Sequence, residues 1–125
     1  MRYKIDNVKN YTETKGWICG HFFPDDSVLK NSDLEVKYST LIPGHTHPMH
    51  YHPHGTEVIL VIKGRLKYSV DGKEFTLKDG DFVFMCANID EAILKVYEPT
   101  IMVSVRTPSM PNNKMNKDIG NRGGR

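Results

Sequence analysis

The fold is indicated by residues 57–77, which read EVILVIKGRLKYSVDGKEFTL. The stretch opens on an apolar run at 58–62. After Lys-Gly at 63–64 it continues with apolar residues at every second position, which is typical of a half-buried strand. Asp-Gly at 71–72 favours the tight turn of a β-hairpin, and the alternation resumes beyond it. The sequence therefore predicts three strands, separated by turns at 63–64 and 71–72.

Short apolar segments separated by turn residues continue on both sides of this stretch. They cover 16–23, 34–42, 82–86, 92–97 and 101–106, and Glu-Pro at 98–99 parts the last two. No segment keeps apolar residues at a 3.6-residue period, so we expect little helix. Many short strands joined by turns are typical of an all-β sandwich or barrel. Residues 1–13 are expected to form an extension with either an edge strand or one helical turn.

The length of 125 residues fits one domain with a hydrophobic core. We expect the barrel to span residues 14–107. Residues 108–125 contain few apolar side chains, which predicts a flexible tail. This tail carries a charge of +3, so the rest of the chain carries −1. A nearly neutral domain without a stripe of basic residues argues against nucleic acid as a partner.

Cysteine content and hydropathy predict a cytoplasmic protein with no membrane partner. Cys19 and Cys86 are the only cysteines, too few for a disulfide framework, and they indicate reduced thiols. The first residues lack the apolar segment of a secretory signal. The longest apolar run, 58–62, is far shorter than the roughly 20 residues that cross a bilayer.

Both faces of the 58–62 run are apolar, although one side of a strand in an isolated barrel should face water. Cover by a second sheet of the same chain, or by a partner subunit, would explain this pattern. We favour a homodimer, because two-fold dimers are the commonest oligomers.

Five of the six histidines lie between residues 45 and 54. On a strand, His50 and His52 would point to the same side, about 6–7 Å apart along the chain. Glu57 opens the next strand, which would lie roughly 5 Å away. Two imidazoles and a carboxylate on one face are typical of sites for iron and related metals. The same side chains could instead form a buried network of hydrogen bonds.

The segment 44–64 resembles the first motif of the cupin superfamily, G-x5-H-x-H-x(3,4)-E-x6-G. Its fixed positions are all matched, by Gly44, His50, His52, Glu57 and Gly64. The resemblance spans about residues 34–107. It implies a small, single-domain double-stranded β-helix (jelly-roll) barrel in which His50, His52 and Glu57 bind one divalent metal ion.

The second cupin motif, G-x5-P-x-G-x2-H-x3-N, is matched only in part from Gly80 onward. Cys86, Asn88 and Lys95 stand where Pro, Gly and Asn are usual, and Glu91 occupies the position of the last metal-binding histidine. A carboxylate oxygen can bind a metal, so Glu91 is a candidate fourth ligand. It could alternatively be a general acid or base beside the metal, or a surface residue. A site with two imidazoles and two carboxylates favours Mn²⁺, Fe²⁺, Zn²⁺ or Ni²⁺ over Cu(I).

The remaining histidines are assigned less specific roles. His45 and His47 are expected in an exposed loop, unless they contact substrate or replace a ligand at the mouth of the barrel. His54 would point away from His52, either beside the ligands or into solvent. His21 is expected to make hydrogen bonds on an early strand.

Other candidate residues are interpreted structurally. We expect Cys86 to be buried and inert, and Arg106 to be an exposed arginine at a strand end, although it could pair with an anionic substrate. The expected core aromatic residues, one of which could line a ligand pocket, are Trp17, Phe22, Phe82 and Phe84.

Three functions fit such a site. The first is an isomerase or lyase that uses the metal as a Lewis acid on a small oxygen-rich substrate, a sugar or a carboxylate, with Glu91 moving the proton. The second is an Fe(II)-dependent dioxygenase, and the third is a non-catalytic metal or small-molecule binding module. The fold class does not choose among them. The sequence contains no P-loop, serine-hydrolase or zincin motif.

Overall fold

The structure is a computed structural model and describes residues 2–117. Within this range it has one 3-10 helix, η1 (Val8–Tyr11), and otherwise strands. The strands are β1 (Trp17–Cys19), β2 (Glu35–Leu41), β3 (His47–Tyr51), β4 (Thr56–Val70), β5 (Lys73–Lys78), β6 (Phe82–Met85), β7 (Glu91–Thr107) and β8 (Met115–Asn116). The prediction of an all-β chain is confirmed, and of the two alternatives for residues 1–13 the helical turn is the one that forms. No helix within residues 2–117 is long and apolar enough to cross a membrane.

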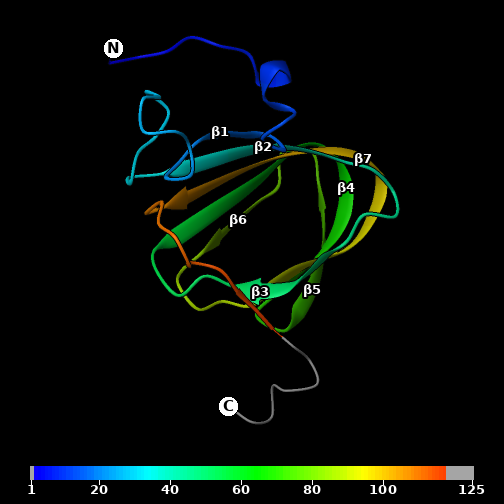
Figure 1. Ribbon diagram of the computed structural model, residues 1–125. Coiled ribbons are helices and arrows are strands. Elements are labelled where there is room, and N and C mark those ends of the chain that lie inside the picture. Colours follow the sequence, from blue (N-terminus) through cyan, green and yellow to red (C-terminus); the bar gives the residue numbers. More distant parts are fainter. Residues whose placement is uncertain (1, 118–125) are drawn as a thin grey trace.

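The strands curve into a barrel around β4 and β7 (Figure 1), which pair antiparallel over nearly their full length. The first half of β4 also pairs with β6, and its second half pairs with β5. In the same way, the first half of β7 pairs with β3 and its second half with β2. Each long strand therefore passes from one sheet to the other, and the result is the expected double-stranded β-helix.

The predicted turn at 63–64 and the predicted break at 98–99 are both wrong, because each lies inside a continuous strand. The β4–β7 register shifts on both sides of Gly64, which has a φ of +116°. A Cβ at Gly64 would lie 2.3 Å from Thr100 Oγ1, so the close approach of the two strands requires glycine. Strands that move between two packed sheets bend through such bulges. The glycine and proline signals therefore mark corners of the barrel.

The apolar core fills the barrel interior. Leu66 and Val61 on β4 are both 0% exposed. The core consists of Leu41, Ile59, Val61, Leu66, Tyr68, Leu77, Met85, Ile93, Val96 and Met102. These residues come from both sheets, so the core joins the two sheets into one unit.

Leu66→Ala is expected to lower the free energy of unfolding by about 2–5 kcal/mol, because it removes buried apolar surface and leaves a cavity. Ile62→Ala is the matched control on the same strand, since Ile62 is 47% exposed. It should cost no more than about 1 kcal/mol. Urea unfolding of the two variants measures the difference, and equal losses would contradict the described core.

Residues 108–117 pack against the barrel, so the prediction of a flexible tail is wrong for this part of 108–125. Ser109 is fully buried, and its hydroxyl donates to Glu35 Oε1 at 2.9 Å. Asn113 is also buried, and β8 pairs with β3. Polar side chains and backbone groups hold the segment in place. It is therefore ordered despite its low content of apolar residues. Residues 118–125 lie outside the described residues.

The outer side of the β6–β4 sheet is apolar. Val58 and Leu60 of β4 pair with Phe84 and Phe82 of β6, and the two phenylalanines are 58% and 66% exposed. They were expected in the core, as was Phe22, which is also exposed; these three predictions are wrong. Both faces of these strands are apolar, so alternation alone could not identify the inner one. An exposed apolar surface of this kind is typical of interaction sites, and the homodimer stays a prediction.

Candidate metal centre

His50 and His52 reach the barrel interior from the end of β3. His50 pairs with Glu91 of β7, and His52 follows two residues later, so both side chains point to the inner side. They are 2% and 6% exposed, and their ring centroids are 5.0 Å apart. The structure therefore brings the two imidazoles together in a buried site.

A backbone carbonyl fixes each of these imidazoles. His50 Nδ1 donates to the Pro48 carbonyl at 2.8 Å, and His52 Nδ1 donates to the Asn113 carbonyl at 2.6 Å. Burial lowers the pKa of His50 to about 4 and lowers that of His52 below its ordinary value. A neutral imidazole has one N–H, so its assignment to Nδ1 leaves the Nε2 lone pair available. This arrangement is typical of metal-binding histidines.

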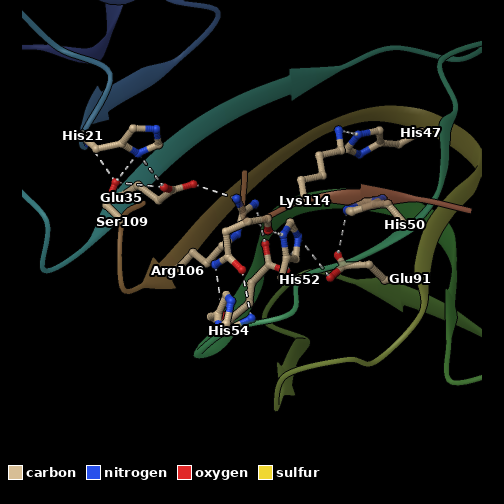
Figure 2. Close-up of polar contacts among 12 residues, drawn as sticks. His21, Glu35, His47, His50, His52, His54, Glu91, Arg106, Ser109 and Lys114 are labelled. Atoms are coloured by element: carbon tan, nitrogen blue, oxygen red, sulfur yellow. Dashed lines mark hydrogen bonds and ion pairs between the residues drawn. The ribbon is translucent and has the colours of Figure 1, made fainter. Parts of the chain in front are cut away.

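Glu57 at the start of β4 and Glu91 at the start of β7 complete the cluster. Glu57 Oε1 lies 3.5 Å from His52 Nε2. Figure 2 shows the Glu91 carboxylate facing both imidazoles, with Oε2 at 3.7 Å from His52 Nε2 and Oε1 at 3.7 Å from His50 Nε2. Both carboxyl groups are as buried as the imidazoles. All four side chains suggested as ligands from the sequence thus meet at one place.

Each carboxylate also has a partner on its other side. Arg106 Nη2 donates to Glu57 Oε2 at 3.2 Å, and Arg106 Nη1 donates to Glu35 Oε2 at 2.6 Å. Tyr68 OH donates to Glu91 Oε1. These contacts leave Glu57 Oε1 and Glu91 Oε2 directed at the imidazoles.

Arg106 is not the exposed strand-end residue that was expected. Its side chain is only 14% exposed, and it lies between two buried carboxylates. The sheet register explains this position, because Arg106 of β7 pairs with Glu35 of β2 on one side and with Glu57 of β4 on the other. The sequence contains Glu35, Glu57 and Arg106, but it does not reveal the strand register that places them side by side.

The two carboxyl groups of the cluster differ in protonation. Burial, and then contact with Glu57, raises the pKa of Glu91 to about 9. Burial also opposes ionisation of Glu57, but Glu91, Arg106 and His52 together hold its pKa below the ordinary value. Without a cation between them, the pair therefore carries a single negative charge at neutral pH.

The donor set fits one divalent metal ion. Among residues 2–117, His52 Nε2 and Glu57 Oε1 are buried side-chain atoms with no hydrogen-bond partner. Such atoms are costly unless something satisfies them, and a cation would satisfy both. Metal–ligand distances of about 2.1 Å place neighbouring donors roughly 3.0–3.4 Å apart, close to the observed 3.5–3.7 Å. The donor atoms of His50, His52 and Glu91 lie within 4.8 Å of one another.

His47 also reaches this site, and its expected place in an exposed loop is wrong. His47 pairs with Ile93 and His50 with Glu91, so three steps along β3 match two along β7. This bulge turns both imidazoles inward, with ring centroids 4.5 Å apart. Burial, followed by His50 and Lys114, lowers the pKa of His47 to about 4. On a regular strand, His47 and His50 would point to opposite faces, because they are three residues apart. The sequence does not show the bulge that brings them to the same face.

The other singled-out residues lie outside the cluster. His45 and His54 are exposed. His21 Nδ1 lies 2.9 Å from Ser109 Oγ, which is the hydrogen bonding expected of it. Cys86 is exposed, so the prediction of a buried thiol is wrong. It lies directly after the end of β6, beside the buried Met85.

A family model described as a cupin domain matches residues 37–91. No curated protein sequence matches the chain. Among solved structures, an uncharacterised conserved protein with a double-stranded β-helix domain from Klebsiella pneumoniae is 26% identical, with a TM-score of 0.64 over 93% of this chain and 99% of that chain. A cupin protein from Bacteroides fragilis is 18% identical, with a TM-score of 0.59 over 71% and 82%. DMSP lyase DddQ from Ruegeria pomeroyi is 14% identical, with a TM-score of 0.64 over 86% and 63%.

The last two similarities concern the fold alone. Fold and site together define a double-stranded β-helix protein with a buried His/Glu cluster inside its barrel. Residues 37–91 match the cupin domain family, and the fold is that of small cupin proteins.

Proposed function

We propose that His50, His52, Glu57 and Glu91 hold one divalent metal ion and that the chain is a metalloenzyme acting on a small oxygen-rich molecule. One observation carries this proposal: His52 Nε2 and Glu57 Oε1 are buried, unpartnered and 3.5 Å apart. Nitrogen and oxygen donors in this combination favour Mn²⁺, Fe²⁺, Zn²⁺ or Ni²⁺.

When bound, the metal would supply Lewis-acid chemistry by polarising a substrate oxygen. The residues of the chain prepare the site for it. The carbonyls of Pro48 and Asn113 keep each imidazole in the tautomer with Nε2 available. Arg106 helps to keep Glu57 ionised, so that its free oxygen is a good ligand.

Tyr68 and Glu91 would handle the proton in isomerase- or lyase-type chemistry. Tyr68 OH donates to Glu91 Oε1, and both side chains are buried. Burial raises the pKa of Tyr68 well above its ordinary value, so the phenol stays protonated and orients the carboxyl group. A carboxyl group held beside a substrate can accept or deliver a proton, which contributes roughly 10²–10⁴-fold to such reactions.

An Fe(II)-dependent dioxygenase is the second candidate, because two imidazoles and a carboxylate on one side of a metal are typical of iron oxygenases. A non-catalytic binding module is the third. The Tyr68–Glu91 hydrogen bond favours the first candidate, since it orients a carboxyl group of the cluster that could move a proton.

Hydrogen–deuterium exchange tests the proposal. The chain, loaded with Zn²⁺ or Mn²⁺, is incubated in D₂O without oxygen with a panel of small 2-oxo acids and ketoses. Proton NMR then follows deuterium entering the carbon next to the carbonyl group. We expect exchange in at least one compound. Turnover that needs iron and oxygen would support the dioxygenase instead, and binding without exchange would support the binding module.

Tyr68→Phe is expected to slow this exchange by about 10–100-fold, because it removes the hydrogen bond that orients Glu91. Metal content, measured by atomic emission, should remain one ion per chain in the variant. Exchange at the wild-type rate would show that Tyr68 does not assist Glu91.

A further inference from the structure

A small cavity of about 190 Å³ opens beside the candidate ligands. Its lining includes the ligands His50, Glu57 and Glu91 together with two lysines, Lys37 and Lys114. At the roughly 30 Å³ that each molecule occupies in liquid water, it has room for about six waters. A ligand of about six non-hydrogen atoms would therefore fill it.

We propose that this cavity takes a small monocarboxylate whose anionic group is bound by Lys37 and Lys114. The inference rests on the proposed function, since it names the substrate class of the same site. A metal with an open position could bind neutral sugars as well as carboxylates. A site with two lysines selects the carboxylates.

Lys37 faces the cavity because of its place in the sheet. It pairs with Ser104 of β7, which in turn pairs with Ile59 of β4. All three line the cavity, so this row of the sheet faces inward. The Lys37 ammonium lies 5.4 Å from the centre of the Trp17 ring, which lines the same cavity.

Lys114 approaches from the C-terminal segment. Figure 2 shows its side chain running to His47, and its Nζ lies 3.1 Å from His47 Nε2. The imidazole is neutral, so the ammonium donates this hydrogen bond. Burial, and then the charge of Arg106, lowers the pKa of Lys114. Asn113, which precedes Lys114 in the chain, provides the carbonyl that accepts a hydrogen bond from His52. The same short segment therefore orients a candidate ligand and supplies a cation.

Neither lysine has a carboxylate partner within the part of the chain that the structure describes. The carboxylates of the cavity have other contacts, because Glu57 is paired with Arg106 and Glu91 accepts a hydrogen bond from Tyr68. Burial, and then the charge of Lys114, lowers the pKa of Lys37. Two neighbouring cations with no directly paired carboxylate, in a partly enclosed cavity, attract an anion.

Lactate and lactamide test this inference, since both have six non-hydrogen atoms and only lactate is charged. Trp17 is the only tryptophan of the chain, so its fluorescence reports directly on the cavity. Each compound is titrated into the full chain, once after removal of metal by chelation and dialysis, and once after loading with Zn²⁺. We expect lactate to change the fluorescence in both forms, and to bind at least about tenfold more tightly than lactamide.

Lys37→Met and Lys114→Met should each weaken lactate binding by about tenfold, as loss of one charge-assisted hydrogen bond would. Lys37→Arg should retain most of the binding. Lys63→Met removes one charge at an exposed position outside the cavity and is the matched control. Equal affinities for lactate and lactamide, no response to lactate, or lysine variants that match the control would overturn the inference. If Zn²⁺ fails to bind but lactate binding still depends on Lys37, the metal proposal fails and the carboxylate site stands.

Discussion

Arg106→Met is expected to lower the free energy of unfolding by about 3–5 kcal/mol at pH 8, which is typical of removing one partner from a buried ion pair. Glu35 and Glu57 are both 4% exposed, and both would lose the guanidinium that they share. The remaining charges would stay buried without a cation. This is a large fraction of the stability of a small domain.

The loss caused by Arg106→Met should shrink in acid. The pKa of Glu57 is lowered in the folded chain, in part by Arg106. The stabilisation that this represents is present above the ordinary pKa of 4.5 and disappears as pH falls through the lowered value. Urea unfolding at pH 8 and in a series of buffers from pH 4.5 downward measures the change. Arg65→Met is the matched control, since Arg65 is exposed and stacks 4.6 Å from the Tyr97 ring. It should cost about 1 kcal/mol or less, and an equal loss in both variants would contradict the buried network.

His52→Ala is expected to abolish thermal stabilisation by metal. At a free Zn²⁺ concentration about 100 times the dissociation constant, binding to the folded chain should contribute about 2.7 kcal/mol. For a domain of this size, that raises the melting temperature by about 10 °C. Removal of the His52 imidazole takes away a central donor, so the variant should show no metal-dependent shift.

His54→Ala is the control for this experiment, because His54 is an exposed histidine of the same segment. Differential scanning calorimetry of both variants, with and without Zn²⁺, measures the shift. Equal shifts in the two variants would show that the metal binds to surface histidines instead of the buried cluster.

The sequence predicted the all-β fold because its turn signals are local. Asp71 and Gly72 have φ values of +53° and +79°, and Val70 pairs with Lys73 across them, as expected for a two-residue hairpin turn. The signals at Gly64 and Pro99 are equally local, but they were assigned to turns. Whether such a residue ends a strand or bends it depends on the neighbouring strand, which the sequence does not show.

The convergence of His50, His52 and Glu57 was predictable from strand geometry and from a specific motif. His47 was not, because its orientation depends on a bulge in the pairing between β3 and β7. Arg106 and the Asn113 carbonyl were missed for a related reason. Their contacts with Glu57 and His52 join segments that are 49 and 61 residues apart in the chain, and sequence patterns do not reveal such pairings.

X-ray absorption at the zinc edge tests the central claim most directly, using the full chain loaded with one equivalent of Zn²⁺. The predicted result is one tightly held ion with scattering from two imidazoles and from carboxylate oxygens at about 2.0–2.2 Å, and loss of that imidazole signal in the His50→Ala/His52→Ala variant. A wild-type spectrum without imidazole scattering, or an unchanged spectrum in the double variant, would contradict a metal held by this cluster.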